Sequence, residues 1–273
     1  MSNGMKMLTS GRRGPTVAPL LLGLMLAFSS APPLLAQDAQ SGDPEAEADV
    51  VVQPEAVQAL DKMAAHLRTL KEFQLTASIK VEDVLEDDQK IEISGETNYY
   101  VRTPNRLKMR METDKSTREY YYDGKTLTHV SPALGYYSVF DAPDTIAKTI
   151  VAAKKKYGVR FPISDLFFWN SQNEGAAEIK SAYFAGQSKI LGDRCNHYAY
   201  RVDGFDIQVW IRSKGDPLPC RMVVTNTDEA ARPQYAATLS WDTEAEFDDS
   251  TFLFAPPPEM GRIDQDEVAT STK

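Results

Sequence analysis

Cys195 and His197 are the two residues whose types and spacing come closest to a nucleophilic pair. A histidine can accept the proton of a thiol, and side chains two residues apart on a strand point to the same side. A working pair also needs a third group that orients the histidine, and the surrounding sequence offers none. We therefore predict no catalytic residue and no enzyme, and an unrecognised hydrolase is the least favoured function.

Metal and cofactor motifs are also missing from the sequence. The three histidines, His66, His129 and His197, fall in separate predicted elements, so that no metal-ligand spacing arises. Asp87-Asp88 and Asp248-Asp249 lack the oxygen-ligand loop of a calcium site and are typical of solvated turns. There is no Gly-x-Ser-x-Gly, phosphate loop or dinucleotide fingerprint. The sequence predicts neither a metal site nor a cofactor.

Cys195 and Cys220 are the only cysteines, and their pairing is left open by the sequence. Two cysteines in an exported protein often form a disulfide. The strand register predicted below places Cys195 opposite Arg212 and Cys220 near Trp210, two strand spacings or roughly 9–10 Å apart, which is too far for a disulfide. A bulge or a loop near Cys195 would bring the sulfurs together, so both a disulfide and two free thiols are possible outcomes.

Large aromatic side chains are the candidates for binding a ligand. Four of them fall within nine residues, which is more than one helical stripe can bury: Phe161, Phe167, Phe168 and Trp169. We expect this cluster to line or cover an apolar cavity, the alternative being that it is ordinary core. Tyr99 and Tyr122 are strand residues that could line the same cavity, or simply form a half-buried sheet face.

Composition and charge describe a globular chain with an acidic surface. The 273 residues are 42% hydrophobic and 25% charged, with a net charge of −9. Residues 1–36 hold three basic residues and no acidic one, so their removal leaves 27 basic against 39 acidic residues, a net charge of −12. Such a chain repels phosphate backbones, and we predict no nucleic-acid partner.

The N-terminus has the layout of a secretory signal peptide. A basic start, an apolar run over 17–28 and a break at Pro32-Pro33 predict cleavage after Ala36 and export to the periplasm. The run is too short to span a bilayer, so no transmembrane segment is expected after cleavage. Polar composition predicts a disordered linker over 37–53 and a disordered tail over 263–273, which leaves a single domain over 54–262.

Hydrophobic periodicity divides that domain into helices and strands. Apolar residues at steps of three and four predict a helix from Pro54 to about Lys71, and a second helix is expected after Asp144, its predicted cap, as far as Gly158. Alternation predicts strands over 73–82, 91–101, 107–111, 120–122, 125–130, 195–202, 205–212, 219–225, 235–241 and 251–254. We expect eight to eleven strands, mostly antiparallel, in one α+β domain with two or three helices.

Asp-Gly dipeptides fix two hairpins within this pattern, Asp123-Gly124 and Asp203-Gly204. Around the second of them, pairing Tyr200 with Ile207 and Tyr198 with Val209 makes one face of both strands apolar.

Ordered motifs along the chain resemble a family of predicted periplasmic bacterial proteins catalogued as a domain of unknown function (number two-zero-nine-two). The resemblance covers about 54–262. Its motifs are Gly95, Arg102-Thr103-Pro104-Asn105-Arg106-Leu107, Tyr122-Asp123-Gly124-Lys125, Tyr136-Tyr137, Pro162-Ile163-Ser164-Asp165-Leu166, Gly192-Asp193-Arg194-Cys195-Asn196-His197, Trp210-Ile211, Pro217-Leu218-Pro219, Pro233-Gln234-Tyr235, Trp241 and Phe252-Leu253-Phe254-Ala255-Pro256-Pro257.

The segment from Gly95 to Pro132 is also similar to the lipoprotein carriers LolA and LolB. That resemblance implies a large curved antiparallel sheet, a half-open barrel, covered by helices over an apolar cavity. The carriers place an arginine directly before their proline, where this chain has Thr103, with Arg102 one step earlier. One step along a strand turns a side chain to the opposite face, so the role of that arginine is not carried over.

Together these observations predict a periplasmic, non-enzymatic binding or carrier module for a hydrophobic ligand such as a lipid, an acyl chain or a lipoprotein. The partner would be that molecule or another envelope protein, and we expect a monomer. The alternative is an envelope structural or interaction protein, a chaperone or sensor, whose edge strands pair with a partner.

Overall fold

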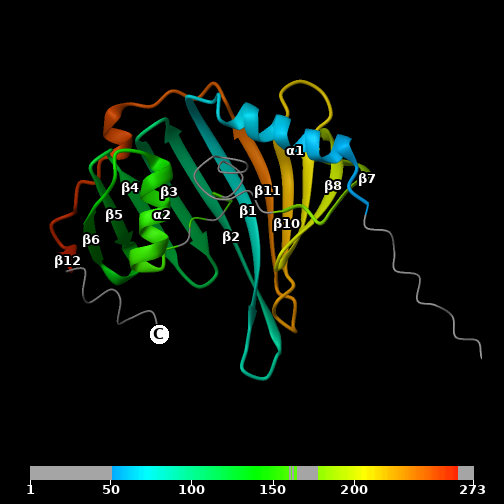
Figure 1. Ribbon diagram of the computed structural model, residues 1–273. Coiled ribbons are helices and arrows are strands. Elements are labelled where there is room, and N and C mark those ends of the chain that lie inside the picture. The colour runs from blue at the N-terminus through cyan, green and yellow to red at the C-terminus, as the bar shows by residue number, and fades with distance from the viewer. Residues whose placement is uncertain (1–50, 160, 162, 165–177, 264–273) are drawn as a thin grey trace, which may run out of the picture. The chain divides into compact units, whose positions relative to one another are not determined.

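The computed structural model describes residues 51–159, 161, 163–164 and 178–263 (Figure 1). The predicted signal peptide (1–36) lies outside these residues, as do most of the predicted linker and of the predicted tail. The last residues assigned to the linker are hydrogen-bonded, since Val52 forms a parallel bridge with Ala182.

The described chain holds two α-helices, two short 3-10 helices and twelve strands. In chain order they are α1 (Pro54–Leu67), β1 (Glu72–Val84), β2 (Lys90–Arg102), β3 (Arg106–Thr113), β4 (Thr117–Tyr122), β5 (Thr126–Ser131), η1 (Pro132–Leu134), β6 (Tyr136–Asp141), α2 (Ile146–Tyr157), β7 (Ser181–Ile190), β8 (Asp193–Val202), β9 (Phe205–Arg212), β10 (Pro219–Asn226), β11 (Gln234–Asp242), η2 (Asp249–Phe252) and β12 (Gly261–Arg262).

All twelve strands form one sheet in the order β12-β6-β5-β4-β3-β2-β1-β11-β10-β9-β8-β7. Neighbouring strands are antiparallel except β12 and β6, which run parallel. The two end strands of the described sheet, β12 and β7, are not paired with each other, so the sheet is curved and unclosed. The predicted fold class, a large antiparallel sheet with two helices, is confirmed. The sheet has twelve strands, one more than the upper limit of the predicted eight to eleven.

Both helices pack on the same side of this sheet, which we call the inner face. The Tyr200 hydroxyl of β8 donates a hydrogen bond to the Ala56 carbonyl oxygen of α1 at 2.9 Å. At the other half of the sheet, the Phe140 ring of β6 lies 4.3 Å from the Tyr157 ring of α2, centroid to centroid. Figure 1 shows α1 in front of β7–β11 and α2 in front of β3–β6. The opposite side of the sheet is called the outer face.

The predicted helices form, with different ends. α1 stops at Leu67, four residues before the predicted Lys71, since Thr69 and Leu70 close single turns instead. α2 is capped by Thr145, whose hydroxyl accepts a hydrogen bond from the Lys148 N–H, so the prediction of Asp144 as the cap is wrong. The side chain of Asp144 instead pairs with the Lys148 ammonium group at 2.9 Å.

The strand predictions fail where the alternation is short or interrupted. β7 was not predicted, because a bulge between Phe184 and Gly186 breaks its period and most of its side chains are exposed. β6 is a six-residue strand that carries a serine at its centre, a pattern too short to identify. The predicted strand over 251–254 is wrong, since η2 ends there and the Phe252 ring packs on the outer face against Phe247.

The register predicted from Asp203-Gly204 is confirmed. Tyr200 lies opposite Ile207, and Cys195 lies opposite Arg212. The other predicted hairpin also forms, with Asp123-Gly124 between β4 and β5.

A disulfide joins Cys195 to Cys220, with 6.7 Å between the two Cα atoms. The pairing of β10 with β9 shifts between Pro219 and Arg221, so Arg221 and not Cys220 lies opposite Trp210. Cys220 is the extra residue of this bulge. The bulge shortens the separation that regular strand spacing makes too long, so the expected distance of 9–10 Å is wrong at this point.

Arg102 lies on the outer face, away from both helices. Its guanidinium forms ion pairs with Glu72 and Asp249, and its Cζ lies 5.3 Å from the centroid of the Phe252 ring. Arg102 therefore holds the segment that follows β11 against the back of the sheet.

Gly95 provides a test of how closely β2 and β3 approach each other. A Cβ atom at Gly95 would lie 2.3 Å from the Glu112 carbonyl oxygen and 2.8 Å from the Thr113 Cα, both of which are backbone atoms. We expect Gly95→Ala to lower the free energy of unfolding by about 2–3 kcal/mol, because the strands must separate. Gly261→Ala is the matched control, since its Cβ would come no closer than 4.0 Å to its nearest neighbour. Equal urea midpoints for the two variants would contradict this account of Gly95.

Candidate functional site

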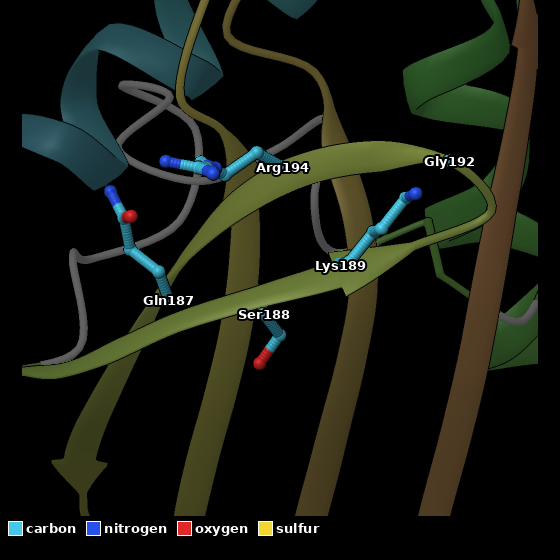
Figure 2. A pocket seen from close by; sticks show the side chains of 5 residues that line it. All are labelled: Gln187, Ser188, Lys189, Gly192 and Arg194. Carbon is cyan, nitrogen blue, oxygen red and sulfur yellow. The ribbon is translucent and has the colours of Figure 1, made fainter.

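A polar pocket of about 520 Å³ lies at the β7–β8 hairpin and is lined by Gln187, Ser188, Lys189, Gly192 and Arg194 (Figure 2). Lys189 and Arg194 lie directly opposite each other across the two strands. Neither forms an ion pair with any residue of the described chain. Like charges in this register repel, but both side chains are exposed and water screens them. The pocket offers hydrogen bonds and positive charge beside apolar surface.

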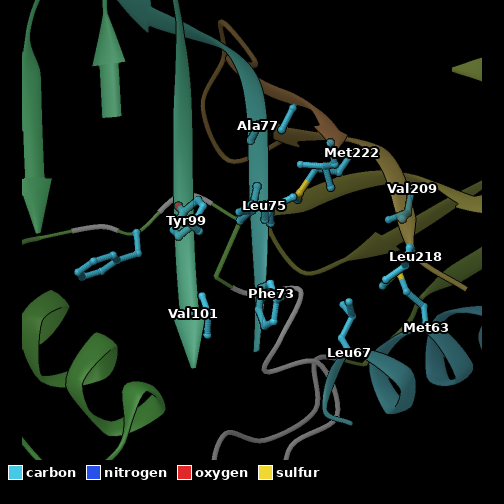
Figure 3. Packing of buried hydrophobic residues seen from close by; sticks show 14 of the residues in the cluster. Met63, Leu67, Phe73, Leu75, Ala77, Tyr99, Val101, Val209, Leu218 and Met222 are labelled. Atoms are coloured by element: carbon cyan, nitrogen blue, oxygen red, sulfur yellow. The ribbon is translucent and has the colours of Figure 1, made fainter. Parts of the chain in front are cut away.

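The inner face offers a much larger apolar surface. The β1 side chains Leu75 and Ala77 are buried, and in Figure 3 they lie between Tyr99 of β2 and Met222 of β10. Cross-strand pairing extends this row of apolar side chains over the neighbouring strands on both sides of β1. One direction runs through Val101, Leu107, Tyr122, Leu127 and Phe140, and the other through Leu239, Ala237, Met222, Val209 and Tyr198. With the exception of Phe140, these residues form one hydrophobic cluster with the buried side of α1.

Three of the predicted cavity residues lie on this inner face. Phe161 is 5% exposed, and its ring centroid lies 5.1 Å from that of Tyr120. Tyr99 is buried, which raises the pKa of its hydroxyl well above the usual value, and the neighbouring Tyr235 raises it further. Tyr122 is fully buried and donates a hydrogen bond to the Pro143 carbonyl oxygen. Their role in binding stays a prediction.

The other members of the predicted aromatic cluster, Phe167, Phe168 and Trp169, lie outside the described residues.

His129 introduces a polar group into the apolar inner face. Its ring stacks on Tyr120, with 4.9 Å between the centroids, and meets the Tyr136 ring edge-on at 6.5 Å. Burial, together with the smaller effect of the positive charge of Arg118, lowers the pKa of the imidazole to about 4. His129 is therefore neutral near pH 7 and contributes hydrogen-bonding capacity rather than charge.

This pKa predicts a specific pH dependence of stability. Between about pH 6.5 and pH 4 the unfolded chain binds a proton at His129 that the folded protein does not, so stability falls as the pH falls. We expect the wild type to lose about 3 kcal/mol more than His129→Gln between pH 7 and pH 4, as measured by urea denaturation. Parallel stability curves for the two proteins would show that the folded pKa is not lowered.

Cys195 and His197 do not form a nucleophilic pair. The sulfur of Cys195 is part of the disulfide. On the outer face, the His197 ring stacks on Trp210 with centroids 3.9 Å apart, and its Nε2 lies 3.0 Å from the Gln208 side-chain oxygen. The geometry assigns His197 a packing role.

Two further features are absent from the residues that the structure describes. No group of three or more His, Cys, Asp or Glu side chains could hold a metal ion there. Neither α1 nor α2 has the length and apolar character that a membrane-spanning helix needs.

Sequence reasoning missed the polar residues of the inner face. Arg118 and Ser138 carry no signal in the sequence, Tyr136 appears only in the Tyr136-Tyr137 motif, and His129 was considered only as a metal ligand. Extended from Asp123-Gly124 as a two-residue turn, the register places Tyr120 opposite Leu127, whereas the structure pairs Tyr120 with His129, so this contact was not predictable. Ser138 could not be found, since β6 was not predicted.

Several solved structures are similar over most of this chain, at low sequence identity. Lipoprotein LppX from Mycobacterium tuberculosis is 12% identical, with a TM-score of 0.45 over 72% of this chain and 100% of its own. An uncharacterised conserved protein from Thermus thermophilus is 11% identical, with a TM-score of 0.44 over 77% of this chain and 99% of its own. A LolA superfamily protein from Nitrosomonas europaea is 9% identical, with a TM-score of 0.35 over 73% and 97%. No curated protein matches the sequence.

One family model matches the chain over residues 56–265, and its description is "Predicted periplasmic protein (DUF2092)". The description agrees with the predicted location, so the protein is periplasmic. Since the match covers more than half of the sequence, this chain belongs to the DUF2092 family of predicted periplasmic proteins.

Proposed function

We propose that this protein is a non-enzymatic periplasmic carrier that holds a hydrophobic ligand, such as a lipid or an acyl chain, against the inner face of its sheet. The observation that carries the proposal is the continuous apolar inner face of an unclosed sheet. Binding by such a surface needs no reactive group. The hydrophobic effect drives it in proportion to the apolar area that the ligand covers.

The sheet is wider than its two helices. Strands lie about 4.8 Å apart, so twelve of them span roughly 50 Å. Two helices, each about 10 Å wide, cover roughly 20 Å of that width. Phe161 and Ile163, from the connection that follows α2, cover part of the remainder. The inner-face side chains are already buried within the chain, so a ligand enters by displacing part of what covers them.

Binding of the uncharged dye N-phenyl-1-naphthylamine, which fluoresces in apolar surroundings, tests the proposal. We expect saturable binding by the folded protein and displacement of the dye by phospholipid or fatty acid. Met111→Glu places a charge on a partly buried inner-face residue and should weaken dye binding about tenfold, because the charge must lose water when the dye binds.

Val151→Glu is the matched control, since this α2 residue is 45% exposed and the same change there adds only a surface charge. It should bind the dye as the wild type does. Absence of saturable binding by folded wild-type protein would reject the carrier function.

The alternative, an interaction protein that pairs its edge strands with a partner, has less support. Part of the β7 edge is occupied, since the Ala182 N–H donates to the Val51 carbonyl oxygen at 3.0 Å and the Gln53 N–H donates to the Ala182 carbonyl oxygen at 2.7 Å. The rest of β7 carries a bulge and the exposed Lys189. A bulge and a charged edge residue are devices that oppose strand addition.

A further inference from the structure

Buried polar atoms without a partner are concentrated on the inner face. Five described side-chain atoms are buried without a hydrogen bond. Four of them belong to inner-face residues: Thr97 Oγ1, His129 Nε2, Ser138 Oγ and the Tyr235 hydroxyl. Each such group costs about 1–3 kcal/mol when it is left unsatisfied, so native proteins keep few of them. Their place on one face indicates that a ligand supplies the missing hydrogen bonds.

Two of these atoms belong to residues that lie side by side. His129 of β5 and Ser138 of β6 are directly opposed across the two strands, and Ser138 is fully buried. Side chains in that register have Cβ atoms about 5 Å apart, so both polar groups can reach one ligand head group. Tyr120 and Tyr136, which flank the His129 ring, add two hydroxyl groups.

Arg118 brings an uncompensated positive charge to the same place. It lies two residues before Tyr120 on the same side of β4. Burial raises the pKa of Tyr120 and the charge of Arg118 opposes that rise, while the same charge adds to the fall that burial causes in the pKa of His129. Arg118 forms no ion pair with the residues that the structure describes, whereas Arg110 of β3 and Arg212 of β9 each pair with a carboxylate. Arg118 is also exposed, so it lies at the solvent side of the polar residues around His129.

We propose that Arg118, His129 and Ser138 form a head-group site for an anionic amphiphile, with the carboxylate or phosphate at Arg118 and the apolar chain along the inner face. The proposal rests on the proposed carrier function and names the ligand class. Arg118 supplies the charge, and neutral His129 and buried Ser138 supply hydrogen bonds. Charge-assisted hydrogen bonds to an anion are about twice as strong as neutral ones, which makes the site selective for an acidic head group.

Calorimetric titration at pH 7.5 with undecanoate, decanol and decyl phosphate tests this site, because the three ligands share a ten-carbon chain and differ only in the head group. The wild type should bind undecanoate or decyl phosphate at least about tenfold more tightly than decanol. The tighter of the two anions identifies the head group as carboxylate or phosphate.

Variants separate the charge from the hydrogen bonds. Arg118→Gln should weaken binding of the anions about tenfold and leave decanol within about twofold, whereas Arg118→Lys should keep most of the preference. Ser138→Ala should weaken the anions about threefold without lowering stability, because its hydroxyl has no partner to lose within the protein. Arg194→Gln, which removes an equally exposed and unpaired arginine from the β7–β8 pocket, is the matched control and should change nothing.

The possible results distinguish the head-group site from the carrier function. Equal binding of anions and decanol by the wild type, or loss of the preference in Arg194→Gln but not in Arg118→Gln, overturns the head-group site and leaves the carrier function intact. Binding of none of the three ligands rejects the carrier function, and the head-group site with it.

Discussion

Replacing Phe73 by alanine is expected to lower the free energy of unfolding by about 4 kcal/mol. Phe73 is 2% exposed and lies opposite Val101, and its ring centroid is 5.7 Å from that of Trp241 in β11. Truncation removes apolar surface that folding had buried and leaves a cavity between β2 and β11. Such a loss is a large part of the roughly 5–15 kcal/mol that stabilises a typical domain.

Urea denaturation followed by circular dichroism measures this change. Phe205→Ala is the matched control, because Phe205 also lies near the start of its strand, β9, but is 41% exposed. We expect the control to lose less than about 1 kcal/mol. Equal losses in the two variants would contradict the burial of Phe73 in the shared core of β1 and β11.

Removing the disulfide is expected to have the second largest effect. The double variant Cys195→Ala/Cys220→Ala should lose about 3.5 kcal/mol of stability, because the bond closes a loop of about 25 residues and restricts the unfolded chain. Both cysteines are changed together so that no free thiol is left. Reduction of the wild type should shift its denaturation midpoint to that of the variant.

A thiol titration of the oxidised, unfolded wild type provides the independent check. The disulfide predicts no free thiol before reduction and two afterwards. Two free thiols before reduction would show that the cysteines do not pair in the protein.

Much of the fold follows from local sequence signals. The period change near Phe73 marks the passage from α1 to β1, and the Asp203-Gly204 turn sets the register of its hairpin. The Asp123-Gly124 hairpin also forms, but its register differs by two residues from that of a two-residue turn. These signals are reliable in strands whose buried side alternates, such as the first half of β1, because a slip of one residue would expose that side. Alternation in β1 and β2 holds over most of thirteen residues each, long enough to be recognised.

Features that depend on distant partners were not predictable in this way. The bulge at Cys220 is set by how β10 meets β9, and it decides whether a disulfide can form. The apolar run at Phe252 packs on the back of the sheet instead of joining it, and four residues are too few to distinguish these outcomes. Thr145 replaces Asp144 as the helix cap because either residue type can fill that position.

The apolar side of the sheet was predictable from the sequence, but the cluster of polar residues on it was not. Alternation identifies Tyr99 and Tyr122 as residues of the apolar side of the sheet, and both are buried there. His129 and Ser138 come together only through the pairing of β5 with β6. The absence of an ion pair for Arg118 within the described chain is a property of the folded arrangement and leaves no trace in the sequence.

The central claim, that the inner face holds a hydrophobic ligand, is tested most directly by the protein taken from its own periplasm. Mass spectrometry of an organic extract of the purified wild type should find an amphiphile at close to one molecule per chain, and the extract of Met111→Glu should contain much less of it. An extract of folded wild type with no more lipid than that of an unrelated periplasmic protein would contradict the account.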